Sequence, residues 1–347
     1  MTKTNSGQIS LPAKLVKVVT SRRVKKRVAK VVTTILRYTL IITLSFMIMY
    51  PLLRMLHSVF AHPRALGLVT SMWVPAMVSL DNLRVGIGVM DYWVALPFTI
   101  LMVGFVMLLQ LTNAALAGYA FARLRFKGIG ILFVVVLITF VVPSRILMLP
   151  QGVLFRTFDP LWIFTIFGNG PINLFGRPIT LFLMAGLGMG ISSGLFIYIF
   201  RQFYRGLPKE LEEAAYVDGA GVIRTFLTIV LPMAKPAFLT VGVLSFIWNW
   251  NDTHFTGQFN SDMRYLSLRV INLGTPDGGA PRIHQAINMA RGAGRISNDV
   301  LTLSSSIEYD AALMTVVTFL SIIPLVILFF IIQKQFIQGV ERSGIVG

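Results

Sequence analysis

The sequence predicts an all-α integral membrane protein with six transmembrane helices and both termini in the cytoplasm. Hydrophobic residues make up 55% of the 347 residues, charged residues only 13%, and the mean hydropathy is +0.74. A soluble domain would carry about 25% charged residues. Apolar runs recur at about the 20 residues that a helix needs to cross a bilayer, and the basic residues between them agree with one topology.

Six stretches qualify as spans, and no soluble domain of ordinary size fits between them. The spans cover residues 35–55, 93–116, 129–149, 179–200, 237–250 with its flanks, and 311–332. The chain therefore divides into a basic N-terminal tail (1–34), a membrane domain (35–340) and a cytoplasmic C-terminal tail (341–347). The longest segment outside the spans, 251–310, is expected outside the cell, where it could cap a pore or meet an external partner.

The net charge of +17 would suggest nucleic acid as a partner of a soluble protein, but here the basic residues follow the predicted topology. No acidic residue precedes Asp81, and ten Lys and Arg residues precede or enter the first span. The positive-inside rule places this end in the cytoplasm. Later basic clusters at 123–127, 201–235 and 334–342 fall on the same side, so no nucleic-acid partner is predicted.

The first apolar run is interpreted as an uncleaved anchor, because it has the length of a full span and no A-x-A cleavage site follows it. Residues 11–32 could lie as a basic amphipathic helix on anionic membrane lipid. A solvated, disordered tail is the alternative for the first ten residues, which are polar and small.

Between the fourth and fifth spans lies a charged cytoplasmic loop, 205–235, whose central part reads ELEEAAYVDGAGVIRTFLTIVLP. Pro208 suits a first helical turn, and the carboxylates that follow it complement the helix dipole. An apolar but nearly flat face is expected from Leu211, Ala214 and Ala215, whose small side chains let another backbone approach.

Gly219 suits the left-handed turn that ends such a helix. A second short helix is expected from about Val222, ending before Pro232. The sequence thus predicts a compact knob tied to two spans. By propensity alone, the same loop could simply lie on the bilayer surface.

The spacing within this loop carries a resemblance to a known family. The loop resembles, position for position, the EAA loop of ABC importer permeases. The matching positions are Glu213, Ala214 and Ala215, then Gly219, then a hydrophobic pair before Pro232. LPKELEEAAYVDGAG followed by LPMAKPA resembles the carbohydrate-uptake, maltose-type permeases, and so do WVPAMVSLDNL, AGYAFARLRFKG, VVPSRILMLPQ and IIPLVILFFIIQKQFIQGV. Together these stretches cover about 36–340. Departures at 97–99 and 253–254, the longer external loop and the ERSGIVG ending affect the substrate and external contacts.

This resemblance implies the architecture of a type I ABC importer permease in the plasma (inner) membrane of a prokaryote. Such a chain forms half of a pore with a second permease subunit, here expected as a heterodimer. It docks on two cytoplasmic ABC ATPase subunits and receives solute from an extracytoplasmic solute-binding protein. The coupling residues implied are Glu210, Glu213, Ala214, Ala215, Asp218 and Gly219. For Glu213, a contact with the ATPase and capping of its own helix remain open.

No phosphate-binding loop is present, so ATP and Mg are expected on the partner ATPase, with no catalytic residue, cofactor or metal on this chain. Gradient-driven transport is the rival class. Intramembrane carboxylates usually mark its ion path, and the second, third and fourth spans contain none. Arg54 and Arg145 are interpreted as interfacial residues that snorkel. An ABC permease for a non-sugar solute is a further alternative.

Polar side chains inside the apolar spans are candidates for the substrate path, because a sugar needs hydrogen-bond partners and often an aromatic face. Hydrogen bonding between helices is the alternative role for each, and anchoring at the interface is the alternative for the tryptophans. Gly186, Gly190 and Gly194 are expected to form a smooth packing stripe on the fourth span. The path candidates are Asn113, Ser192, Asn249, Trp248 and Trp250.

Overall fold

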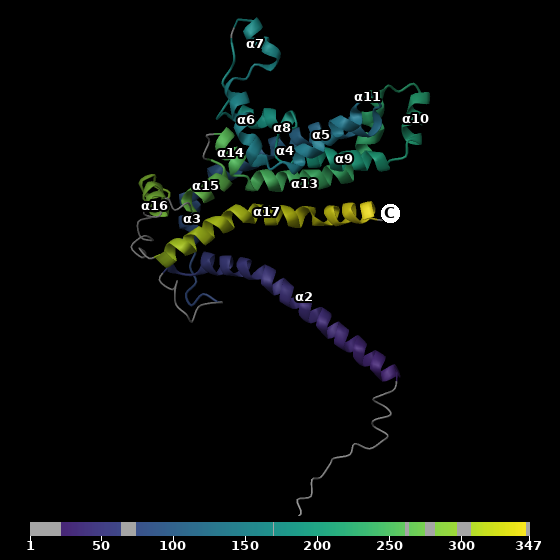
Figure 1. Ribbon diagram of the computed structural model, residues 1–347. Helices are drawn as coiled ribbons and strands as arrows, with labels where there is room; N and C mark the ends of the chain where they lie inside the picture. The colour runs from purple at the N-terminus through teal and green to yellow at the C-terminus, as the bar shows by residue number, and fades with distance from the viewer. Residues whose placement is uncertain are drawn as a thin grey trace, which may run out of the picture.

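Figure 1 shows the computed structural model of the chain, which describes residues 22–63, 74–168, 170–260, 264–274, 282–296 and 307–344. Within these residues the regular structure is helical, and the only extended pairings are two isolated bridges, Ala61 with Val78 and Phe158 with Ile172. The prediction of an all-α protein is confirmed. Most of the basic tail and parts of the external loop lie outside the described residues.

Three helices are long and apolar enough to cross a membrane unbroken: α2 (Arg22–Phe60), α4 (Tyr92–Arg123) and α17 (Ile307–Gly344). They contain the first, second and sixth predicted spans. No part of the apolar window of α2 is buried in the molecule, and α2 contacts mainly α17 and the short helix α3 (Asp81–Met90). Most of α2 is therefore left for the bilayer or for a partner.

The third predicted span is bent. Helix α5 (Ile129–Val141) and helix α6 (Ser144–Arg156) meet at 107° around Pro143. Proline has no backbone N–H to continue the helix, and it disfavours helical geometry at the residue before it. The predicted span over 129–149 is therefore not one straight helix, because α6 leaves the direction of α5.

The fourth predicted span is broken into α8 (Pro178–Gly186) and α9 (Ser193–Gly206). The connecting residues contain Gly188 at φ 74° and Ser192 at φ 54°, and left-handed backbone ends an α-helix. A single helix over 179–200 is therefore wrong, and so is a continuous glycine stripe. Gly190 lies inside the break instead.

The predicted knob consists of α10 (Glu210–Val217) and α11 (Val222–Thr225). After α11 the chain continues through a π-helical turn (Phe226–Val230) and α12 (Leu231–Met233), then bends by 74° into α13 (Lys235–Asn251). Helical backbone that begins at Val222 therefore continues through Pro232 to Met233, and the expectation that it ends before Pro232 is wrong. Because proline fits a first helical turn, Pro232 is accommodated at the start of α12.

Helix α4 is central and packs against α8, α9 and α13, while α17 packs against α13 (Figure 1). Figure 1 shows α10 and α11 at the end where α17 finishes. At the opposite end lie α14 (His254–Phe259), α15 (Leu266–Gly274) and α16 (Arg282–Gly292). Arg269 and Arg295 approach the Asp91 carboxylate at 3.8 and 3.3 Å, so ion pairs hold this segment to the α3–α4 junction.

Candidate coupling site and translocation path

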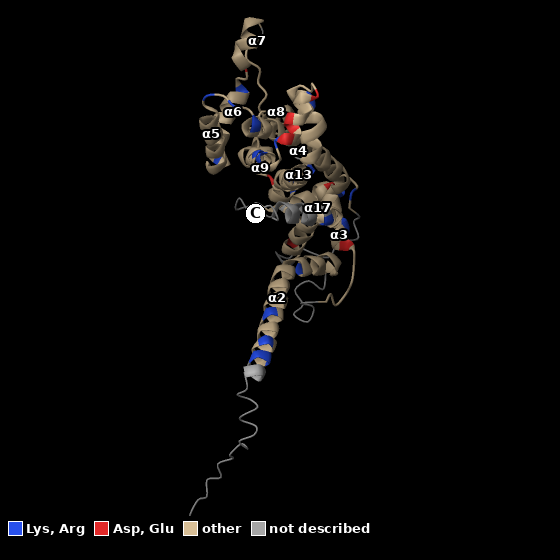
Figure 2. Cartoon of the chain, turned by 90° about the vertical axis from the view of Figure 1, so that its right-hand side faces the viewer, with Lys and Arg blue, Asp and Glu red and all other residues tan. Residues whose placement is uncertain are grey.

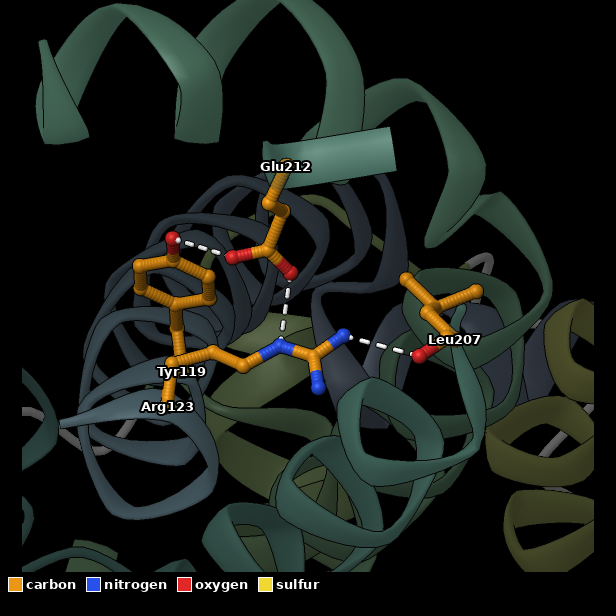
Figure 3. Close-up of polar contacts among 4 residues, drawn as sticks. All are labelled: Tyr119, Arg123, Leu207 and Glu212. Carbon is orange, nitrogen blue, oxygen red and sulfur yellow. Dashed lines mark hydrogen bonds and ion pairs between the residues drawn. The ribbon is translucent and has the colours of Figure 1, made fainter. Parts of the chain in front are cut away.

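The knob is fixed to the end of α4 by a buried ion pair (Figure 3). Glu212 accepts a hydrogen bond from Nε of Arg123 at 2.6 Å and one from the hydroxyl of Tyr119 at 3.1 Å. Arg123 also donates from Nη2 to the carbonyl oxygen of Leu207 at 2.9 Å. The paired side chains are only 9% and 8% exposed. One guanidinium therefore joins the end of α4 to the end of α9 and to the first turn of α10.

An aromatic cluster lies next to this ion pair. The ring of Tyr119 is 5.7 Å from that of Tyr204 and 4.7 Å from that of Phe226, and Phe200 lies 5.8 Å from Tyr204. The pair Tyr119–Tyr204 packs edge to face, Phe200 stacks on Tyr204, and such aromatic contacts are favourable beyond the apolar area that they bury. The cluster therefore joins α4, α9 and the π-helical turn next to the knob.

The predicted coupling residues lie mostly on the outside of the knob. Glu210, Glu213 and Ala214 are exposed, whereas Ala215 is buried beside Glu212. The expected apolar face therefore differs: Glu212 and Ala215 face the protein, and Leu211 and Ala214 face outward. No side-chain hydrogen bond caps α10, which argues against the capping role for Glu213.

The turn that ends α10 has the predicted geometry. Asp218 is the exposed C-cap residue, and Gly219 follows at φ 80°. The backbone N–H of Ala220 donates to the carbonyl of Ala215 at 2.9 Å, and that of Gly219 to the carbonyl of Tyr216 at 3.0 Å. A Cβ on Gly219 would meet nothing within 4 Å, so only the left-handed backbone requires glycine there.

Replacing Gly219 with alanine is therefore expected to destabilise the turn by about 1–2 kcal/mol and to reduce transport while the protein still inserts. Gly221 offers a matched control, because it lies at φ −74° and its Cβ would also meet nothing. Solute uptake and the amount of protein in the membrane should be measured for both alanine variants. Equal transport by the two would contradict this role of Gly219.

Polar side chains meet in the middle of the helix bundle. Gln110 on α4 accepts hydrogen bonds from Ser245 at 2.6 Å and Asn249 at 2.8 Å, both on α13, and donates to the carbonyl oxygen of Ile191 at 3.2 Å. Asn113 donates to the carbonyl oxygen of Gly186 at 2.9 Å. Two amides of α4 thus satisfy carbonyl groups that the break between α8 and α9 leaves without helical partners.

The glycines in this break let the amides approach. A Cβ on Gly190 would lie 2.6 Å from Nε2 of Gln110, and one on Gly188 would lie 3.0 Å from Oδ1 of Asn113. Asn249 and Gln110 also line a cavity of about 20 Å³ together with Asp252 and Tyr265. That volume holds a water molecule but not a sugar ring, so the bundle is closed at this level.

The remaining path candidates differ in accessibility. Ser192 lies at the break and precedes α9. Trp248 is partly buried and stacks on Phe196 with ring centres 5.5 Å apart. Trp250 is 1% exposed, and its indole N–H donates to the carbonyl oxygen of Ser321 at 3.0 Å. With Trp250 committed to the contact with α17, the structure leaves no open face of this ring for a sugar.

Comparisons with known proteins identify the class of protein to which this chain is similar. The profile of the family described as "Binding-protein-dependent transport system inner membrane component" matches residues 114–274. The melibiose/raffinose/stachyose import permease MelC of Bacillus subtilis is 27% identical over 82% of this chain and 87% of its own. The arabinooligosaccharides permease AraQ of Halalkalibacterium halodurans is 26% identical over 88% of this chain and 93% of its own.

A crystal structure of a bacterial ABC transporter involved in the import of alginate contains a chain of the same fold, with a TM-score of 0.64 and 18% identity over 89% of this chain and 98% of that chain. The helical bundle with its coupling knob is that of a transporter permease, and a permease is not itself an enzyme. Residues 114–274 match the inner membrane components of binding-protein-dependent transport systems, and most of the chain is similar to sugar import permeases, so the comparisons support a multi-pass permease subunit of an ABC transporter. ATP hydrolysis takes place on a partner.

The site residues that the sequence did not single out are Tyr119, Arg123 and Glu212. Glu212 was one of three carboxylates in the first turn of α10, and its partners lie 93 and 89 residues away in the chain. The available signal was helical spacing, because Glu212 and Ala215 share a face of α10. Nothing in the sequence showed that this face was the buried one.

Proposed function

We propose that this chain forms half of the pore of an ATP-driven carbohydrate importer, with an oligosaccharide or related sugar as substrate. One observation carries the proposal: a knob held by a buried ion pair presents exposed apolar residues outward. Val217 on this surface is 87% exposed, Leu211 is 41% exposed and Ile223 is 76% exposed. Such a rigid, partly apolar projection is suited to insertion into a cleft of another protein.

The proposed partners are a second, different permease subunit, two cytoplasmic ABC ATPase subunits that bind ATP and Mg, and an extracytoplasmic solute-binding protein. Glu210, Glu213, Ala214 and the turn at 218–219 would contact the ATPase. ATPase closure would move α10, and the Arg123–Glu212 pair would carry this movement to α4 and α9. The closed bundle could then open toward the outside, as expected of a two-state element.

The proposed topology has six crossings, with both ends in the prokaryotic cytoplasm. In addition to α2, α4 and α17, the bent third span, the broken fourth span and α13 each cross once. This arrangement puts the tail (1–34), the coupling loop (205–235) and residues 341–347 inside and the loop (251–310) outside, with 35–340 forming the membrane domain. This topology is supported by the position of α10, which lies at the same end of the molecule as the last turns of α17 (Figure 1).

The carbohydrate assignment is supported by the relatives named for melibiose, raffinose, stachyose and arabinooligosaccharides. The test is to isolate the chain in mild detergent with its co-purifying subunits, reconstitute the complex in liposomes with the solute-binding protein, and measure ATP-dependent uptake of labelled oligosaccharides. Uptake of a non-sugar solute alone would refute the substrate class. Recovery of the chain without any ATPase, under conditions that preserve other membrane complexes, would refute the coupling role.

Asn249 is the side chain best placed to meet a sugar when the bundle opens, because it is partly exposed and lines the cavity beside Gln110. Replacing it with alanine removes one hydrogen-bonding group, typically about 0.5–1.5 kcal/mol. We expect the apparent KM for the transported sugar to rise roughly two- to tenfold, with ATPase recruitment unchanged.

Asn251 provides the control, since it is exposed and its side chain bonds the carbonyl oxygen of Ile247 in its own helix at 3.0 Å. An equal effect of the two alanine variants on KM would contradict the placement of Asn249 in the path.

A further inference from the structure

An apolar projection extends from the bundle between α6 and α8. It consists of residues 157–168 and 170–172 and carries α7 (Ile163–Ile166) at its tip. Figures 1 and 2, which differ by a quarter turn, both show α7 well away from the remaining helices. The described contacts of α7 are with the adjoining 3₁₀ turn (Pro160–Trp162). The projection therefore gains little from packing against its own bundle.

The surface of this projection is strongly apolar. Leu161 is 82% exposed, Trp162 73%, Ile166 74% and Phe167 77%. Between Asp159 and Arg177 the sequence contains no ionisable side chain. Four large apolar side chains exposed together, without a charge among them, are unfavourable in water, and such patches mark contact with a protein or a membrane.

The backbone holds these side chains outward at the expense of strain. Leu161 and Trp162 are both at φ 56°, in the left-handed region that bulky residues rarely adopt. Such strain persists where surrounding contacts impose it and is concentrated at functional positions. Here it holds two large, exposed apolar side chains in the 3₁₀ turn next to α7.

Several backbone donors of the tip are paired within the projection itself. Asp159 accepts hydrogen bonds from the backbone N–H of Phe164 at 2.9 Å and of Thr165 at 3.2 Å, and also from the hydroxyl of Thr165. The backbone N–H of Phe167 donates to the carbonyl oxygen of Ile163 at 3.1 Å. A segment that enters a low-dielectric medium must pair its backbone donors internally, and these donors are paired.

The neighbouring helix indicates which medium covers the tip. Because α6 turns by 107° away from α5, it runs across the direction of the span rather than along it. Its exposed apolar residues Ile146, Leu149 and Val153 lie at i, i+3 and i+7, on one face, while Met148 and Phe155 are buried. This pattern is that of a helix lying in the membrane interface, and the tip continues the same apolar surface.

The charges at the base complete the pattern. Arg156 and Arg177 flank the projection and are exposed, and the Arg156 guanidinium lies 4.5 Å from the ring centre of Phe175. Basic side chains at the level of lipid phosphates, with a tryptophan and aliphatic residues beyond them, are the arrangement of an interfacial anchor.

We propose that this projection is a lipid anchor, which inserts Leu161, Trp162, Ile166 and Phe167 into the outer leaflet while Arg156 and Arg177 contact lipid phosphates. The inference rests on the proposed topology only for the choice of leaflet. The anchor would hold the α5–α6 bend at the membrane surface and so give the bundle a fixed point while the opposite end moves with the ATPase.

The chain has no cysteine, so a single introduced cysteine can be labelled specifically in the assembled transporter. A Phe167→Cys variant carrying an environment-sensitive fluorophore should be placed in liposomes that contain lipids with a nitroxide near the headgroup. We expect blue-shifted emission and loss of most of its intensity. An Arg84→Cys variant on α3, at a side chain that is 72% exposed, should keep its emission and be quenched by aqueous iodide instead.

Quenching of the Phe167→Cys probe by iodide and not by lipid nitroxide would overturn the proposal. Protection of the probe from both quenchers would also overturn it, because it would mean that a protein covers the tip. A small nitroxide label at the same cysteine, read by oxygen accessibility, should give the same result and excludes insertion driven by the fluorophore. Labelling of Arg84→Cys from the outside by an impermeant maleimide tests the topology separately.

Discussion

Replacing Arg123 with methionine is expected to release the coupling helix from α4 and to abolish transport. Methionine keeps much of the side-chain volume but leaves the Glu212 carboxylate buried with only the hydroxyl of Tyr119 as partner. Leaving a buried charge unpaired costs about 3–5 kcal/mol. The carboxylate will therefore move toward water and take α10 with it, so thermal stability, ATPase co-purification and uptake should all fall.

Two comparisons distinguish this mechanism from a general loss of positive charge. Arg125 is exposed at the same end of the molecule, and its methionine variant should behave as the parent protein. Replacing Arg123 and Glu212 together with methionine removes both charges, and buried ion pairs replaced by apolar residues often regain stability. The double variant should therefore be more stable than Arg123→Met alone. Equal stability of Arg123→Met and Arg125→Met would refute the structural role of the pair.

Replacing Gly118 with leucine should separate α4 from α9 and destabilise the whole bundle. A Cβ at this position would lie 2.6 Å from Cβ of Phe200 and 3.0 Å from the backbone nitrogen of Arg201. Because one of these atoms is backbone, the clash cannot be relieved by rotating a side chain. Overpacking lowers the free energy of unfolding by about 1–3 kcal/mol in ordinary cores. A whole leucine side chain placed against backbone is expected to cost more than the lower value of this range.

Gly104 provides the matched control on the same helix, because a Cβ there would meet nothing within 4 Å. Thermal unfolding of the purified complex should show a large loss for Gly118→Leu and little change for Gly104→Leu. Similar melting temperatures for the two variants would show that the close approach of α4 and α9 does not support the fold.

Hydropathy and charge placement allowed the class of protein to be predicted, because α2, α4 and α17 are long uninterrupted apolar helices. The bend at Pro143 could have been expected from the missing N–H of proline, but hydropathy alone does not distinguish a bent helix from a straight one. The glycines of the fourth span misled for a related reason. Glycines spaced by four residues are typical of a packing stripe on a helix. Glycine is also the residue that favours left-handed backbone, which ends a helix, and Gly188 in the same segment has that backbone.

The coupling loop was predictable as a motif and less so as a structure. The positions of α10 and of the turn at Gly219 follow from local rules for helix ends. The orientation of α10 does not, because it depends on Arg123, which lies 89 residues before Glu212 in the sequence. A carboxylate in a first helical turn is ordinarily solvated. Only the tertiary contact with Arg123 makes Glu212 the buried one of the three carboxylates in the first turn of α10.

The broken fourth span also has a consequence for the order of synthesis on the ribosome. The carbonyl groups that bind Asn113 and Gln110 belong to residues 73 and 81 positions further along the chain. At roughly 5–20 residues per second, about 4–16 s separate the synthesis of Gln110 from that of Ile191. During this interval α4 carries amides whose partners do not yet exist, so the contact between α4 and the broken span can form only after this delay.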